Sequence, residues 1–102
     1  MNNSNFYSFL GLCQRAGKVV SGELAVNIDL KKGKIKLLVI AEDTSDNTKN
    51  EYLKKAIKNK IPVILIGNKD ILGAAIGKSY RALIGVKDMK MAINLIKIYE
   101  NK

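Results

Sequence analysis

The sequence predicts an α/β protein, folded as a three-layer α/β/α sandwich around a small mixed sheet. Apolar runs of strand length alternate with segments of helical periodicity along all 102 residues, a pattern typical of this class. Two of the runs, residues 35–41 and 61–66, are almost continuously apolar, as in strands that helices cover on both faces. The segment between them is long enough for a helical crossover, which would make the two strands parallel. No linker or repeat interrupts the pattern, so we expect one domain over residues 1–102.

The first half of the chain predicts a helix, a short strand, a second helix and the central strand. Apolar residues recur at helical spacing from Phe6 to Ala16, and Gly17 ends this helix. Residues 18–20 form a short extended strand. After it, Ser21 is the predicted N-cap of the second helix, and Glu23 is expected in its first turn, where a carboxylate suits the positive end of the helix. That helix ends with Lys31 and Lys32 in its last turn and Gly33 at the left-handed capping position. Residues 35–41 then form the central strand.

The second half continues the alternation with three helices and two strands. A helix over about residues 46–59 should turn Leu53, Ala56 and Ile57 inward. The strand at residues 61–66 places its proline at the start, and Asn68 caps a short helix over about residues 69–76, which Gly77 ends. A last strand covers residues 82–86, and Asp88 caps the final helix. The apolar stripe of that helix is broad, so we expect deep packing of Met89, Ala92, Ile93, Ile96, Met91, Leu95 and Ile98.

Charge and the rare residue types restrict the classes of function. The chain has 18 Lys and Arg against 9 Asp and Glu, a formal net charge of +9, which indicates a polyanionic partner. Histidine is absent, which removes the usual general base near neutral pH and every Ser-His or Cys-His catalytic arrangement. No apolar run reaches the ~18 residues that span a membrane, and Met1 to Asn5 lack the basic start of a secretory signal. We therefore expect a cytoplasmic binding protein with no enzymatic activity, cofactor or metal.

Three motifs that could carry chemistry each have a simpler explanation. Residues 73–79 are similar to a phosphate-binding loop, but only three residues separate the two glycines and the string follows a helix rather than a strand. Glu42 and Asp43 could bind a cation or act as acid and base, but we favour a role in capping the next helix, because hard cations need more oxygen ligands. Cys13, the single cysteine, lies on the apolar stripe of the first helix and is predicted to be a core residue.

The basic residues carry the most information. Lysines cluster around the second helix, among them Lys18 and Lys32, and cover the third helix, where we read them as a solvated face. The loop from Lys78 to Arg81 differs, because Tyr80 stands between two cations. An aromatic ring beside cations offers base stacking together with phosphate contacts, the combination that unpaired nucleotides favour.

Three segments of the chain resemble one protein family in order and spacing. They are residues 11–18 (GLCQRAGK) with Ser21-Gly22, residues 32–37 (KGKIKL) running into Ala41-Glu42-Asp43, and residues 72–77 (LGAAIG). The sequence is similar to the archaeal seven-Ae type ribosomal protein superfamily, whose members bind kink-turn RNA, and in particular to its short bacterial YlxQ-like branch. The resemblance implies a four-stranded sheet in the α/β/α sandwich and a structured RNA as the partner. We expect the protein to be a monomer. It places the RNA at the start of the second helix, the turn after the central strand and the loop after the Leu-Gly helix. Together with the two lysines above, the predicted RNA-binding residues are Lys18, Ser21, Gly22, Glu23, Lys32, Glu42, Asp43, Lys78, Ser79, Tyr80 and Arg81.

One departure from the family's pattern keeps a second hypothesis open. Where kink-turn binders carry Asn or Lys, then Glu, and later Lys, this chain has Leu24, Ala25 and Ile28, whose side chains cannot form hydrogen bonds. RNA recognition would then rely on the backbone and on the loop around Tyr80. Alternatively, these three apolar residues dock a partner protein, provided that they are exposed.

Overall fold

The computed structural model describes residues 3–101, so Met1, Asn2 and Lys102 lie outside the described residues. Helices and strands alternate, as the sequence predicts. Along the chain they are α1 (Ser4–Arg15), β1 (Val19–Ser21), α2 (Glu23–Lys31), β2 (Leu37–Ile40), α3 (Asp46–Lys58), β3 (Val63–Leu65), α4 (Lys69–Ala75), β4 (Leu83–Val86) and α5 (Met89–Glu100).

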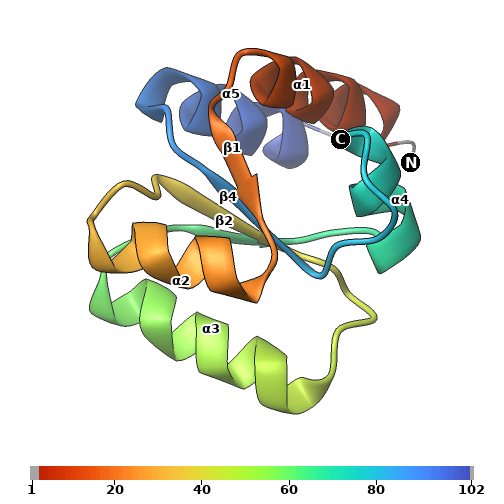
Figure 1. The fold of residues 1–102 in the computed structure, drawn as a ribbon. Helices are drawn as coiled ribbons and strands as arrows, with labels where there is room; N and C mark the ends of the chain where they lie inside the picture. The colour runs from red at the N-terminus through yellow and green to blue at the C-terminus, as the bar shows by residue number, and fades with distance from the viewer. Residues whose placement is uncertain (1–2, 102) are drawn as a thin grey trace.

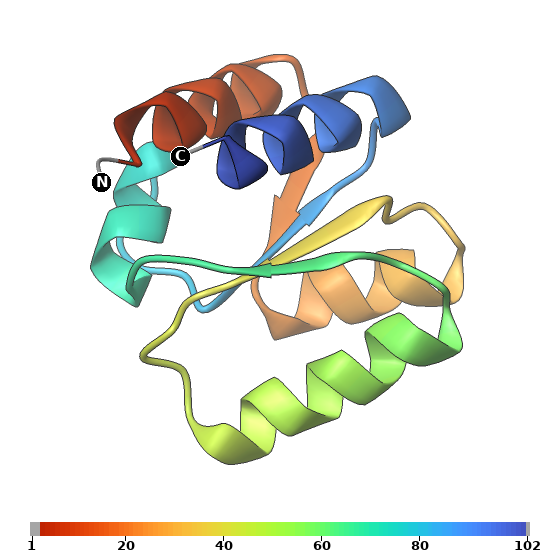
Figure 2. The ribbon, with the colours of Figure 1, turned by 180° about the vertical axis from the view of Figure 1, so that it is seen from behind.

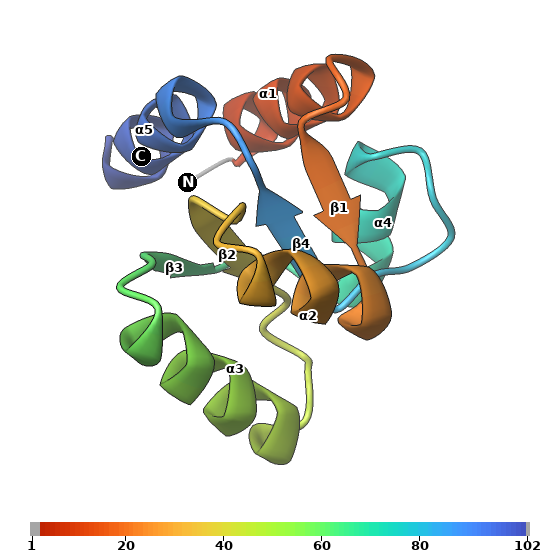
Figure 3. The ribbon, with the colours of Figure 1, turned by 60° about the vertical axis from the view of Figure 1, so that its left-hand side comes forward.

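The four strands form one mixed sheet in the order β1-β4-β2-β3 (Figure 3). β2 and β3 are parallel, with Leu38 opposite Val63, which confirms the crossover predicted from the length of the connection. β4 is antiparallel to both of its neighbours, pairing Val86 with Val19 of β1 and with Leu37 of β2.

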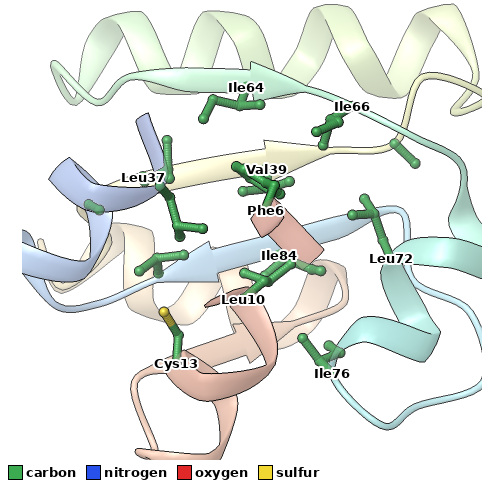
Figure 4. Close-up of a cluster of buried hydrophobic side chains, with 14 residues drawn as sticks. Phe6, Leu10, Cys13, Leu37, Val39, Ile64, Ile66, Leu72, Ile76 and Ile84 are labelled. Atoms are coloured by element: carbon green, nitrogen blue, oxygen red, sulfur yellow. The ribbon is translucent and has the colours of Figure 1, made fainter. Parts of the chain in front are cut away.

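Helices cover both faces of the sheet, which confirms the three-layer sandwich. α1, α4 and α5 lie on one face and α2 and α3 on the other (Figures 1 and 2). Each face has its own apolar cluster, because successive strand residues point to opposite sides. On the first face Phe6, Leu10 and Cys13 of α1 meet Val39, Ile84 and Leu72 (Figure 4). On the second face Val26, Leu30, Tyr52 and Ala56 pack on Leu38, Ile40 and Leu83.

The strand directions divide the connections between the two ends of the sheet. β1, β2 and β3 finish at the end where β4 starts, and they begin at the end where β4 finishes. In Figure 1 the segments after β2 and after α4 lie on the right, whereas those joining α2 to β2 and β4 to α5 lie on the left. We call the right-hand end, where α4 lies, the α4 end, and the opposite one the lysine end.

Three of the four predicted side-chain positions at helix starts are confirmed. Asn68 accepts a hydrogen bond from the Ile71 N–H at 2.9 Å, and Asp88 accepts one from the Met91 N–H at 2.9 Å. Glu23 lies in the first turn of α2, as expected. The predicted N-cap of α2 is wrong, because Ser21 is the last residue of β1 and Gly22 occupies the N-cap without a side-chain hydrogen bond.

Two predictions about packing are also wrong. In α3 the predicted inward residue Ile57 is 78% exposed, and Tyr52 is buried in its place beside Ala56. In α5 Met89 and Ile93 are half-exposed rather than deeply packed. They line a groove with Ile61 and Pro62, next to the edge strand β3. The stripe of α5 therefore extends past the edge of the sheet, and only part of it reaches the core.

Candidate functional site

Four segments that are distant in the sequence converge at the α4 end. They are the start of α2, the turn after β2, the start of α4 and the loop from Lys78 to Arg81. Arg81 connects two of them, since its Nε donates a hydrogen bond to the Ser21 hydroxyl at 3.1 Å across 60 residues of sequence. Its backbone N–H donates to the Lys69 carbonyl at 3.1 Å. The arginine thus fixes the loop to the end of β1 and to the start of α4.

Gly73 allows the loop to pack closely against α4. A Cβ at this position would lie 2.3 Å from the Ser79 carbonyl oxygen and 2.5 Å from the Tyr80 Cα. The Lys78 N–H also donates to the Gly73 carbonyl at 2.8 Å. Because only glycine leaves room for the loop backbone here, Gly73 inside α4 determines where Tyr80 lies.

Tyr80 presents an accessible aromatic ring with a cation near it. The side chain is 60% exposed, and Lys69 Nζ lies 5.9 Å from the ring centroid. Lys69 is not among the site residues predicted from the sequence. One signal could have indicated it, because a lysine in the first turn of a helix opposes the helix dipole and so requires another reason to be there.

The start of α2 is open to close approach. Gly22 has a φ of +87°, and an added Cβ would meet nothing within 4 Å. Its N–H donates to the Leu83 carbonyl at 3.0 Å, which ties the helix start to β4. A helix start without a side-chain cap can direct backbone N–H groups toward an anion or a base edge. Glu23, the next residue, is exposed.

Glu42 and Asp43 are exposed in the turn after β2. Asp43 does not cap α3, contrary to our prediction for this pair; one of its carboxylate oxygens accepts a hydrogen bond from the Lys69 N–H of α4 at 3.0 Å. Ser45 caps α3 instead, accepting from the Thr48 N–H at 3.3 Å. The turn after β2 is joined to the connection between β3 and α4, since the Glu42 N–H donates to the Gly67 carbonyl at 2.9 Å. The acidic pair therefore helps to assemble this end of the molecule.

The structure separates two predicted site residues from the others. Lys18 precedes β1 and Lys32 follows α2, so both lie at the lysine end. The other nine predicted residues lie together at the α4 end. The sequence clustering of Lys18 and Lys32 with Ser21–Glu23 is thus not a spatial clustering.

The apolar residues at the family's polar positions lie beside this site. Leu24 is 78% exposed and Ile28 is 44% exposed, whereas Ala25 is partly buried. Leu24 and Ile28 are one helical turn apart, and residues at this spacing are neighbours on a helix surface. The docking hypothesis requires exposed side chains, and Leu24 and Ile28 meet that condition, whereas Ala25 meets it only in part.

The described residues show no sign of a metal or thiol site. Within residues 3–101 no three His, Cys, Asp or Glu side chains are grouped so that they could hold a metal ion. Cys13 is buried, as predicted, and burial raises the pKa of its thiol, which keeps it protonated and unreactive. No helix in the described part of the chain is long and apolar enough to cross a membrane.

Comparison with known proteins agrees with this architecture. An RNA-binding protein YlxQ from Bacillus subtilis (strain 168) is 34% identical over 100 residues, which is 98% of this chain and 100% of the relative. The structure of a protein of unknown function from Bacillus halodurans C superposes with a TM-score of 0.89 at 36% identity, covering 93% of this chain and 96% of the other. A 15.5kD RNA binding protein from Giardia lamblia shares the fold, with a TM-score of 0.78 at 17% identity over 97% of this chain and 85% of the other.

The family assignment rests on nearly the whole chain. Residues 4–97 match one family, and that range includes every strand of the sheet and all the segments that meet at the α4 end. The resemblance seen in the three sequence segments is confirmed. The chain belongs to the ribosomal protein L7Ae/L30e/S12e/Gadd45 family.

Proposed function

We propose that residues 1–102 act as a single non-catalytic RNA-binding domain that recognises structured, kink-turn-like RNA with its α4 end. The observation that carries the proposal is the hydrogen bond from Arg81 to Ser21, which holds an exposed aromatic loop beside an open helix start. The YlxQ relative is named as an RNA-binding protein. The net charge of +9 favours the same partner. We further propose that the protein works as a cytoplasmic monomer.

Each part of the α4 end has a distinct task in this proposal. Tyr80 stacks on an unpaired base, since every base offers a π-face. Lys69 and Lys78 contact phosphates, which position the RNA without reading its sequence. Gly22 lets the backbone of α2 approach a base edge or a phosphate. The side chains of Leu24 and Ile28 can contact only apolar parts of the RNA, so its shape is read by the backbone and the loop.

The test compares a kink-turn RNA with a plain RNA duplex of equal length over a salt series. We expect tighter binding to the kink-turn RNA. Tyr80→Ala should weaken that binding by ~1–3 kcal/mol, whereas Tyr80→Phe, which keeps the ring, should bind like the wild type. Lys78→Ala should reduce the magnitude of the salt slope by about 0.9 if the lysine contacts a duplex phosphate. Equal affinity for the two RNAs, or wild-type binding by Tyr80→Ala, would contradict the proposal.

A second candidate function is docking of a partner protein through Leu24, Ala25 and Ile28. The exposure of Leu24 and Ile28 favours it, because exposed apolar residues on one helix face can form the centre of an interface. A Leu24→Ser/Ile28→Ser double variant separates the two functions. Docking predicts a partner that stays bound after RNase treatment and is lost in the variant, while affinity for purified RNA is kept. Loss of RNA affinity alone would assign the same residues to the RNA surface.

A further inference from the structure

The positive charge of the protein gathers at the end of the sheet opposite the proposed site. Within residues 3–101, the four connections at the lysine end (16–18, 32–36, 59–62 and 87–88) hold six lysines and one carboxylate. The connections at the α4 end (22, 41–45, 66–68 and 76–82) hold two cations and two carboxylates. The excess charge that predicts a polyanionic partner therefore lies mainly away from Tyr80.

Backbone hydrogen bonds hold three of the basic segments side by side. The Lys87 N–H donates to the Lys18 carbonyl at 2.8 Å, and the Lys36 N–H donates to the Val86 carbonyl at 2.7 Å. These segments surround a depression of about 320 Å³ whose lining contains no acidic residue; it is formed by Gly17, Lys18, Gly33, Lys34, Lys36 and Lys87. An added Cβ on Gly17 or Gly33 would meet nothing within 4 Å, so the depression is open at both turns.

Few internal partners neutralise these lysines. Lys87 Nζ lies 3.7 Å from the Asp29 carboxylate, and Lys36 Nζ donates to the Gly33 carbonyl at 3.4 Å. The one carboxylate of the connections, Asp88, accepts the Met91 N–H as the cap of α5. Lys18, Lys32 and Lys34 are exposed. Like charges that share a depression repel one another, and an anion between them relieves that repulsion.

We propose that the lysine end is a second RNA surface, which binds backbone phosphates while the α4 end binds the structured element. This inference rests on the proposed function in taking RNA as the polyanion. Lysine is a compact point charge suited to phosphate rather than to base edges, so this surface adds affinity and orientation without sequence preference. The lysines of α3 follow one another along a single helix, as a solvated face does, whereas four of the six at the lysine end come from separate segments and line one depression. The domain would then contact two stretches of RNA backbone at opposite ends of its sheet.

A charge-matched pair of variants tests the proposal. Lys18→Gln/Lys34→Gln removes two exposed cations from the lysine end, and Lys54→Gln/Lys97→Gln removes two exposed cations from the middle of α3 and the last turn of α5. Both changes lower the net charge equally. The salt slope of binding to kink-turn RNA with long flanking stems should fall in magnitude by about 1.5 in the first variant, because each phosphate contact contributes roughly 0.7–0.9. It should stay near the wild-type value in the second. Equal losses in the two variants, or no loss in the first, would overturn the proposal.

Lysine footprinting provides a measurement that needs no variant. The wild-type protein is treated with an amine-acylating reagent with and without the same RNA, and modified lysines are identified by mass spectrometry. RNA should protect Lys18, Lys32 and Lys34, while Lys54 and Lys97 stay reactive; unchanged reactivity at the first three would overturn the proposal. If Tyr80→Ala binds normally but Lys18→Gln/Lys34→Gln loses salt slope, the proposed site at the α4 end is wrong and the lysine end stands. The reverse pattern overturns the lysine end alone.

Discussion

Gly73→Ala tests whether the packing of one loop controls the proposed RNA site. Gly73 lies inside α4, where alanine would ordinarily stabilise a helix by about 1 kcal/mol relative to glycine. The new methyl group would, however, lie 2.3 Å from the Ser79 carbonyl oxygen and 2.5 Å from the Tyr80 Cα, and real Cβ contacts essentially never fall below 3.0 Å. Both neighbours are backbone atoms, so no side chain can rotate away. Such overpacking costs typically ~1–3 kcal/mol, which equals or exceeds the gain in helix propensity.

Two measurements follow the Gly73→Ala change. Urea unfolding should show a stability that is unchanged or lower by up to about 2 kcal/mol, the difference between the two effects. RNA affinity should fall at least as far as in Tyr80→Ala, because the loop carries both Tyr80 and Arg81. The control is Ala74→Gly, an exposed position in the same helix, which costs about 1 kcal/mol of helix propensity and leaves the loop in place. A Gly73→Ala protein that is more stable than the wild type and binds RNA equally well would refute the reasoning.

Three further changes test single contacts. Arg81→Lys removes the Nε donor to Ser21 and should cost about 1 kcal/mol of stability; the same cost in Ser21→Ala, with little added in the double variant, would identify the shared bond. Asn68→Ala removes the cap of α4 and should lower the free energy of unfolding by ~1 kcal/mol, whereas Asn68→Asp should not. Burial raises the pKa of Tyr52 above its ordinary value of 10.0 despite the opposing effect of Lys55. The folded state therefore favours the neutral phenol. The stability that this preference contributes is complete below about pH 10 and is lost as the pH rises through the folded-state pKa. Between pH 9 and 11 the unfolding free energy should fall less steeply in Tyr52→Phe, and parallel curves would exclude this cause.

The order of helices and strands was predictable because local signals agree with the fold. Asn68 and Asp88 cap the helices they precede, and continuous apolar runs mark the two parallel strands. Burial within a helix was less predictable. In α3 two sets of residues have the spacing of a core-facing stripe: Leu53, Ala56 and Ile57, or Tyr52 and Ala56. Only the packing of α3 against the sheet shows that the second set faces the core. In α5 the predicted apolar stripe exists, but it extends past the edge strand β3. The periodicity of a helix does not indicate where the sheet beneath it ends.

The α4 end was predictable in its segments but not in its contacts. The family pattern identified the loop and the helix start, and the structure brings them together through Arg81 and Ser21. Lys69 was not predicted, because nothing in the sequence relates it to Tyr80, eleven positions away. The two side chains come close only because the loop packs back against Gly73. Asp43 was assigned to α3, the helix that follows it, although its carboxylate accepts the Lys69 N–H at the start of α4.

The separation of the two charged regions follows from the length of α2. A nine-residue helix is ~13 Å long, and α2 starts at the α4 end and finishes at the lysine end. Residues 21–23 and 31–36 are therefore close in sequence but lie at opposite ends of the sheet. Carboxylates accompany the cations at the α4 end, and screening limits the reach of the distant lysines to roughly 8 Å at physiological salt. An RNA that contacted only the α4 end would gain little from the charge of +9. The salt dependence of binding thus measures how much of the molecule the RNA covers. A slope larger than Lys69, Lys78 and Arg81 could give together, at about 0.9 per phosphate contact, would indicate contacts beyond the α4 end, and we expect these at the lysine end.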